Sequence, residues 1–209
     1  FGGGGPVSTV DRIDYSNDTP TATAKGPLSL ARRYLAATGN ASYGYFGGGH
    51  PGPYSTVDRI DYSSDTSTAA VKGSLSAAKM RLGATGNTSY GYFGGGQPGP
   101  VSSVDRIDYS SDTPTAAAKG PLSLARSVVA ATSSRINGFL TAETRSATQI
   151  NGSPYGYFGG GFNPTPSQMS SIDRTDFSND TATATPKGQL SVGRKSFAGT
   201  GNNSYGWNA

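Results

Sequence analysis

Short runs of apolar and polar residues, bounded by glycine, proline, serine or asparagine, recur along this chain. The run 8–15 reads Ser-Thr-Val-Asp-Arg-Ile-Asp-Tyr, and its β-branched and aromatic residues favour a strand. A polar turn at 16–19 separates it from a short Thr/Ala-rich segment at 21–24. The run Tyr-Leu-Ala-Ala-Thr at 34–38 and the run Ser-Tyr-Gly-Tyr-Phe at 42–46 follow. The pattern predicts four short strands in each such stretch.

Residues 28–37 leave two interpretations open. Their alanine, leucine and arginine residues favour a helix. The short repeat and the turns on both sides, one of them at Gly39-Asn40, favour a strand instead. We expect a strand.

The aromatic residues run into a block of glycines, as in Tyr45-Phe46-Gly47-Gly48-Gly49. Only glycine accepts both a positive φ and the close approach of another backbone, so the block predicts a strand that ends sharply beside another segment. An aromatic residue followed by this glycine block occurs four times, at 1–4, 46–49, 93–96 and 158–161, and divides the chain into four copies of one unit. These copies cover residues 1–45, 46–92, 93–157 and 158–209.

Each copy has a basic residue, a small-residue strand, a turn, an aromatic-Gly-Gly block, a Val-Asp-x-Ile-Asp-Tyr strand or a close variant of it, and a Leu-Ser segment. This order resembles the kelch repeat, whose unit is one four-stranded blade of a β-propeller. In the second copy the matching residues are Val57, Asp61, Tyr62, Leu75, Lys79, Gly94 and Gly95. More distantly, such repeats are similar to ones in virion or tail-fibre proteins of environmental phages.

The resemblance and the repeat together imply an all-β fold, a small β-propeller with four kelch-like four-stranded blades in one domain, 1–209. The start, Phe1-Gly2-Gly3-Gly4, supplies the half of a strand that 204–207 lacks. We therefore expect the N- and C-terminal segments to share one blade and close the ring. The alternative is a fragment of a larger kelch-type propeller.

Composition fits such a fold. Hydrophobic residues make up 33% of the chain, which is low for a thick core, while 10% aromatic residues are too many for a disordered chain. Close-packed sheets rich in small residues, including 31 glycines, reconcile the two values. No apolar run approaches the roughly 20 residues of a membrane span.

The net charge of +4 comes from 17 basic and 13 acidic residues. No run of Lys or Arg exceeds two residues, and both signs recur at fixed places in each copy, which predicts local pairing rather than nucleic-acid binding. The chain has no cysteine, so disulfides and thiolate metal sites are excluded.

An Asp-Arg-x-Asp motif occurs in every copy. Paired carboxylates can serve acid/base catalysis or hold calcium, but a catalytic site is normally unique and this motif is repeated. We therefore expect the motif to form ion pairs between blades with a basic residue that also recurs. The motif residues are Asp11, Arg12, Asp14, Asp58, Arg59, Asp61, Asp105, Arg106, Asp108, Asp173, Arg174 and Asp176, and the basic residues are Arg32, Lys79, Arg126 and Arg194.

Other catalytic chemistry is poorly represented. His50 is the only histidine, lies in a Gly/Pro loop where we expect it to be solvated, and cannot build a histidine metal site alone. The glycine blocks lack the Gly-Lys-Ser/Thr that a phosphate-binding loop needs. We predict no enzyme activity, no cofactor and no metal.

One feature breaks the repeat. The third copy carries an insertion at 133–152 in place of the short Gly-Asn turn. Binding residues gather on loops that a rigid scaffold holds, and a long loop usually has a function or is disordered. The candidate binding residues in this loop are Arg135, Phe139, Leu140, Glu143 and Arg145.

These patterns favour a non-enzymatic binding or structural module that recognises a protein or a glycan. They also allow a homo-oligomer and favour an extracellular or virion-associated location, as part of a fibre or virion. The alternative function is a glycan-cleaving propeller enzyme, which would need unpaired carboxylates in one pocket.

Overall fold

The computed structural model describes residues 5–133, 154–165, 167–196, 198–201 and 206–208. These residues form sixteen β-strands and no helix, and each copy of the repeat contributes the four strands that the sequence predicts. In chain order the strands are β1 (Val10–Arg12), β2 (Thr23–Lys25), β3 (Ala36–Gly39), β4 (Tyr43–Gly47), β5 (Val57–Asp61), β6 (Ala70–Lys72), β7 (Gly83–Gly86), β8 (Tyr90–Gly94), β9 (Val104–Asp108), β10 (Ala117–Lys119), β11 (Ala130–Ser133), β12 (Tyr155–Gly159), β13 (Ser171–Asp176), β14 (Thr185–Gln189), β15 (Gly199–Gly201) and β16 (Gly206–Asn208).

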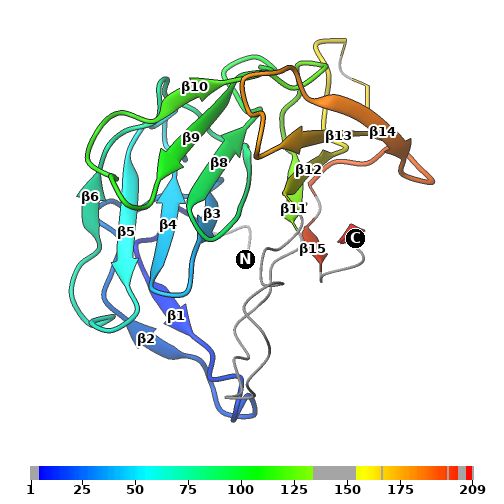
Figure 1. Cartoon of the computed structure of the whole chain (residues 1–209). Helices are drawn as coiled ribbons and strands as arrows, with labels where there is room; N and C mark the ends of the chain where they lie inside the picture. The colour runs from blue at the N-terminus through cyan, green and yellow to red at the C-terminus, as the bar shows by residue number, and fades with distance from the viewer. Residues whose placement is uncertain (1–4, 134–153, 166, 197, 202–205, 209) are drawn as a thin grey trace, which may run out of the picture.

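The strands form five antiparallel sheets (Figure 1). Three sheets have four strands in sequence order: β3–β6, β7–β10 and β11–β14. The other two, β1–β2 and β15–β16, have two strands each. Each four-stranded sheet takes its first two strands from one copy of the repeat and its last two from the next, because the glycine block follows its second strand.

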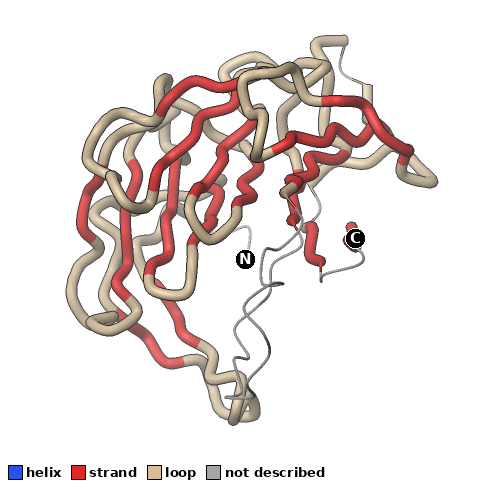
Figure 2. Tube along the Cα trace, in the orientation of Figure 1, coloured by secondary structure: helices blue, strands red, loops and turns tan. Residues whose placement is uncertain are grey.

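The sheets follow one another in a fan whose first strands lie innermost (Figures 1 and 2). β3 packs beside β7, β7 beside β11, and β11 beside β15. The Thr38 hydroxyl donates to the Thr85 carbonyl over 3.1 Å, and the Ser133 hydroxyl donates to the Gly86 carbonyl over 2.8 Å. The arrangement of these sheets is compatible with a propeller.

The hydrophobic core lies between successive sheets rather than in one central mass. Tyr45 of β4 stacks on Tyr109 of the next sheet with ring centroids 4.8 Å apart, and Tyr92 stacks on Phe177 at 4.6 Å. Glycine makes room for these layers, since a Cβ at Gly47 would meet the ring of Phe93. Stacked aromatic rings and small residues explain how a chain with few apolar residues has a packed interior.

The glycine block ends its strand as the sequence predicts. After β4, Gly48 and Gly49 take φ values of 74° and 123°, which favour glycine. The Gly49 amide donates to the Lys79 carbonyl at 2.8 Å, and a Cβ at Gly48 would lie 2.6 Å from that same oxygen. The block is therefore where one sheet meets the segment that leads into the next.

Residues 28–35 correct the strand prediction. The strand begins only at Ala36, and the residues before it form no helix but cross from one sheet to the next. The Leu28 amide donates to the Ser8 carbonyl, whereas the Arg33 amide donates to the His50 carbonyl. Because its backbone groups bond to two different sheets, this segment cannot continue either one.

The predicted blade shared by the two ends stays a prediction. β1–β2 and β15–β16 are separate sheets, and no strand pairing joins them among the described residues. Residues 1–4 and 204–205, which the shared strand needs, lie outside the described residues.

Candidate functional site

The first aspartate of the repeated motif is buried in an ion pair. Asp58, Asp105 and Asp173 have no exposed surface, and each meets the basic residue that recurs before the innermost strand. The oxygen–nitrogen distances are 2.5 Å for Asp58–Arg32, 2.8 Å for Asp105–Lys79 and 3.0 Å for Asp173–Arg126. A serine hydroxyl donates to the second carboxylate oxygen in each case, from Ser29, Ser76 and Ser123 respectively.

Arg32 shows what this ion pair does. Its guanidinium also donates to the carbonyls of Gly48 at 2.7 Å and Thr56 at 2.9 Å, so it crosslinks the lead-in segment, residues 28–35, to both ends of the loop between β4 and β5. Burial lowers the pKa of Arg32, and the charge of Asp58 opposes that shift. A buried pair of this kind, in which both carboxylate oxygens accept bonds, holds backbone segments in place and leaves no carboxylate oxygen for a substrate.

A second kind of aspartate joins neighbouring sheets. Asp112, in the turn after β9, accepts from the Tyr45 hydroxyl at 2.8 Å and from Arg59 at 2.7 Å, and Lys72 lies 3.3 Å away. All three donors belong to the preceding sheet, β3–β6. Asp180 repeats the arrangement with Tyr92 at 2.8 Å, Arg106 at 2.7 Å and Lys119 at 3.1 Å. Asp65 forms ion pairs with Arg12 at 2.8 Å and Lys25 at 3.2 Å.

The surroundings of these aspartates favour their ionised form. Burial would raise the pKa of Asp112, but the hydrogen bonds and charges of Tyr45, Lys72 and Arg59 outweigh it, and the pKa is lowered. The pKa of Asp180 is lowered in the same way. Burial raises the pKa of the Tyr45 hydroxyl well above its usual value, and the hydrogen bond to Asp112 and the charge of Asp112 raise it further.

The last aspartate of the motif caps a turn. The Asp61 carboxylate accepts from the backbone amide of Ser63 at 2.9 Å and from its hydroxyl at 2.6 Å. These two bonds, the hydroxyl first, lower the pKa of Asp61. The equivalent residues Asp14, Asp108 and Asp176 make the same bonds to Ser16, Ser110 and Ser178.

The predicted ion pairs thus form, with one correction. In three copies the buried aspartate meets the recurring basic residue, but this pair joins a sheet to its own lead-in segment. The pairs between sheets use the turn aspartates, which the sequence marked only as turn formers because Ser-Asn-Asp and Ser-Ser-Asp are typical turn sequences. In the first copy the equivalent aspartate, Asp11, is exposed.

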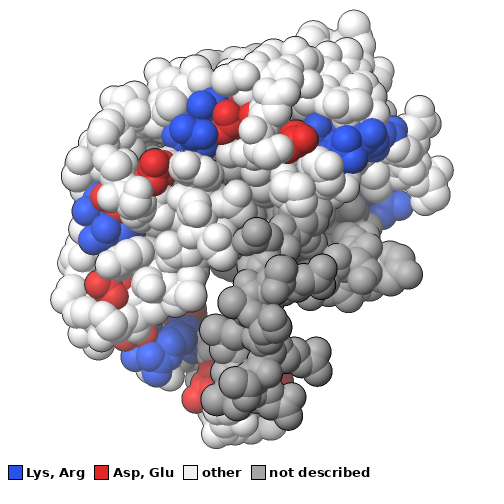
Figure 3. Space-filling view, viewed as in Figure 1, with Lys and Arg blue, Asp and Glu red and all other residues white. Residues whose placement is uncertain are grey.

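The surface charge reflects this pairing. Basic and acidic atoms lie side by side in groups over the face shown in Figure 3. Among the described residues no group of three or more His, Cys, Asp or Glu side chains could hold a metal ion.

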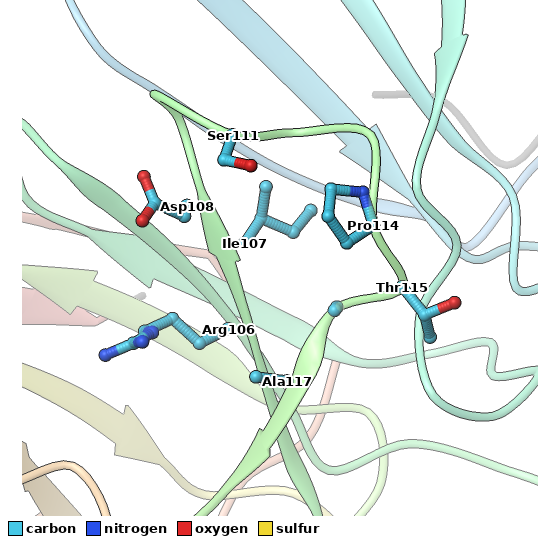
Figure 4. A pocket seen from close by; sticks show the side chains of 8 residues that line it. Arg106, Ile107, Asp108, Ser111, Pro114, Thr115 and Ala117 are labelled. Atoms are coloured by element: carbon cyan, nitrogen blue, oxygen red, sulfur yellow. The ribbon is translucent and has the colours of Figure 1, made fainter.

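A shallow pocket of about 190 Å³ lies beside β9 and the turn that follows it. Figure 4 shows the Ile107 side chain between β9 and that turn, while Arg106 and Asp108 point to the other side of the strand. Arg106 is bonded to Asp180, and Asp108 caps Ser110. The pocket therefore has an apolar floor and no acid and base facing each other across it.

The predicted binding residues of the insertion, Arg135, Phe139, Leu140, Glu143 and Arg145, lie outside the described residues. The described strands on either side fix where the insertion leaves the fold. β11 and β12 pair from Ala130↔Gly159 to Ser133↔Gly156, which matches the pairing of Ala36↔Gly47 to Gly39↔Gly44 in β3 and β4. The insertion replaces the hairpin turn and leaves the register of the sheet unchanged.

An aromatic and basic cluster lies where the lead-in segments meet the innermost strands. Tyr34 has its ring centroid 5.1 Å from the guanidinium carbon of Arg33, 4.7 Å from that of Arg81, and 6.1 Å from the ring of His50. His50 is half-buried beside Tyr34 rather than solvated as predicted, and its Nδ1 accepts from the Gly52 amide. The sequence analysis missed this cluster, although its residues differ from copy to copy where the neighbouring positions repeat.

No protein-family model matches the sequence, and the search of curated proteins gives no match either. Within the part of the chain that the structure describes, no helix is long and apolar enough to cross a bilayer.

Proposed function

We propose that this chain is a propeller scaffold with kelch-like blades that binds a partner or builds part of a larger assembly, and that it is not an enzyme. The observation that carries the proposal is the use of its carboxylates. In the three four-stranded sheets, every aspartate of the repeated motif, and each turn aspartate at 65, 112 and 180, is bonded by partners that recur from copy to copy. Side chains that repeat in every sheet maintain the fold, and a binding function then falls to residues that do not repeat.

The proposed ring closes across the end seam, the gap between sheet β11–β14 and sheet β1–β2. Asp18 occupies the position of Asp65, Asp112 and Asp180 in the repeat, and it is exposed. On sheet β11–β14, Tyr157, Arg174 and Lys187 occupy the positions of Tyr45, Arg59 and Lys72. We call a turn aspartate with its Tyr, Arg and Lys partners a hub, as at Asp112 and Asp180. The two sides of the end seam therefore carry the acceptor and the three donors of a third hub.

A charge exchange tests the closure. Asp18→Lys and Arg174→Glu should each destabilise the chain, and the double variant should regain most of the loss, because it restores opposite charges across the end seam. Denaturant unfolding measures the coupling, and sedimentation shows whether the chain is a monomer. Additive losses in a monomer would mean that the end seam stays open, as in a fragment of a larger propeller.

A binding and turnover screen tests the function. The purified chain should retain protein or glycan ligands from an array, and should leave a panel of glycosides unhydrolysed. Hydrolysis that an aspartate-to-asparagine replacement abolishes would instead establish the alternative, a glycan-cleaving propeller enzyme. The pocket beside β9 gives this alternative little support, because its charged side chains are already bonded to other residues.

A part in a virion or fibre, and hence an extracellular or virion-associated location, fits a scaffold whose strands bury few large side chains and whose turns are rich in Ser, Thr and Asn. A homo-oligomer would fit the same role. Electron microscopy of the native particle, with labelled antibody to this chain, would test the assignment.

A further inference from the structure

We propose that the cluster of Arg33, Tyr34, His50, Arg81 and Gln97 binds the carboxylate or sulfate groups of an acidic polysaccharide. This inference rests on the proposed scaffold function and assigns a ligand class and a site to it. We call these five residues the axial cluster.

The axial cluster is held at one end of the innermost strands. The Arg81 amide donates to the Tyr34 carbonyl at 2.8 Å, and the Val128 amide donates to the Arg81 carbonyl at 2.7 Å. β3, β7 and β11 begin within two residues of these positions and pack side by side. Residues from separate copies of the repeat are therefore brought together by the backbone.

The backbone at these positions is strained. Tyr34, Arg81, Val128 and Ser196 have φ values of 56–59°, a region in which glycine is far easier to accommodate than any other residue. All four copies nevertheless carry a side chain there, although the fold uses glycine freely elsewhere. Because the conformation recurs in all four copies, it belongs to the scaffold, and it presents a different side chain from each copy.

The same position is where the copies stop resembling one another. Two residues earlier each copy has a basic residue, and one residue later it has Leu, Val or Phe. At the strained position itself the four residues are Tyr, Arg, Val and Ser. Repeated positions maintain the scaffold, so a position that differs in every copy is suited to a contact that only one face of the molecule makes.

The two arginines of the axial cluster have no ion-pair partner among the described residues. Nine other basic residues in the same part of the chain each have a carboxylate partner within salt-bridge distance. Guanidinium groups stacked on an aromatic ring keep N–H donors at their edges, and these suit an oxyanion.

Neutral groups beside the two cations favour a sugar over other anions. The Gln97 amide oxygen lies 3.4 Å from an Arg81 nitrogen, and Tyr34 is 42% exposed. Amide, imidazole and hydroxyl groups bond sugar hydroxyls, whereas nucleic acid would need a longer row of cations. Tyr34 is exposed and the other four residues are half-buried, so the axial cluster can be reached from the surface and fits a repeating polymer better than a small molecule that needs a closed pocket.

Binding of defined polymers to the full chain tests the site. The probes are heparin for sulfate groups, polygalacturonate for carboxylate groups, dextran as the neutral polysaccharide, and polyglutamate as an acidic peptide. We expect heparin or polygalacturonate to bind at low salt, with affinity falling as salt rises, and dextran not to bind. The two acidic polysaccharides distinguish the sulfate from the carboxylate.

Three variants locate the binding. Arg33→Ala and Arg81→Ala should each weaken it about tenfold, because each removes one charge-assisted contact. Tyr34→Gly should also weaken it while easing the strained φ, so a loss of binding there does not reflect unfolding. The control is Arg12→Ala, which removes the same charge from an exposed side chain in the β1–β2 sheet and should change the affinity less than twofold.

Equal losses in Arg12→Ala and Arg33→Ala would overturn the proposal, because binding would then follow net charge alone. Tightest binding to polyglutamate would assign the axial cluster to an acidic peptide instead. Failure of every polyanion to bind would also overturn it, while retention of another ligand without turnover would leave the scaffold function standing.

Discussion

The two seams between four-stranded sheets, on either side of sheet β7–β10 and called interior seams below, differ sharply from the end seam. At each interior seam a turn aspartate, Asp112 or Asp180, is held by a tyrosine, an arginine and a lysine of the preceding sheet. At the end seam the same residue types are present, but Asp18 is exposed and none of these bonds forms. Identical sequence motifs therefore exist in a bonded and an unbonded state within one molecule.

The backbone shows the same contrast. Gly73 and Gly120, at the ends of β6 and β10, donate to the carbonyls of Asp112 and Asp180. Gly188 is their equivalent, and there β14 runs on to Gln189, which pairs with Ser171 of β13. β6 and β10 end where the next backbone amide bonds to a neighbouring sheet, and β14 continues where no such bond forms among the described residues. Sheet packing therefore decides where the outermost strand ends.

The largest effect is expected inside a sheet. Asp105→Asn removes the carboxylate that neutralises Lys79, whose side chain is 3% exposed, and should lower the free energy of unfolding by about 3–5 kcal/mol. Urea denaturation followed by circular dichroism measures it. As a control, the double variant Asp105→Leu and Lys79→Met should recover much of the loss, because it leaves no buried charge unpaired.

A loss as large in the double variant as in Asp105→Asn would mean that the serine and backbone bonds, and not the charge pair, hold the lead-in segment. The test would then separate the two roles of the buried aspartate.

Sequence reasoning foresaw the number of strands, the glycine-terminated strand ends and the pairing of repeated charges. It succeeded because these features recur in every copy and follow from local rules such as the positive φ of Gly48 and Gly49. It failed at residues 28–35, which bond two sheets at once, and at Asp112, whose partners come from another copy. It also missed the axial cluster, since Tyr34 and Arg81 meet only through the packing of β3 on β7.

Replacing a glycine by alanine tests how closely the sheets pack at each seam. A Cβ at Gly73 would collide with the Pro114 carbonyl of the neighbouring sheet, so Gly73→Ala should cost about 2–4 kcal/mol by forcing the sheets apart. At Gly188 a Cβ meets nothing within 4 Å. If the end seam closes as proposed, Gly188→Ala should approach the cost of Gly73→Ala in urea denaturation, and an unchanged stability would show that no sheet packs there.

Acid should weaken the interior seams. The folded-state pKa values of Asp112 and Asp180 are lowered, so the unfolded chain binds more protons than the folded chain at acidic pH. The stability that these two groups contribute is therefore present above their unfolded pKa of about 4. It is lost as the pH falls through the lower folded values. Unfolding measured from pH 7 to pH 2 should show this decline, with a smaller acid-dependent loss in the Asp112→Asn and Asp180→Asn double variant.

The turn-capping aspartates contribute to the same loss of stability at low pH, because their pKa values are also lowered. A double variant that loses stability toward acid as steeply as the original chain would assign the whole effect to these exposed caps.

The smallest effect isolates one hydrogen bond at each seam. Tyr45→Phe removes the hydroxyl that donates to Asp112 and should cost about 1–2 kcal/mol, because the bond is buried and its acceptor is charged. Tyr157 is its equivalent at the end seam and is only partly buried. Tyr157→Phe should cost a similar amount if Asp18 docks there, whereas the loss should vanish in the Asp18→Asn background. A loss that persists in that background would assign the Tyr157 hydroxyl to a different acceptor, and the hub at the end seam would then differ from those at Asp112 and Asp180.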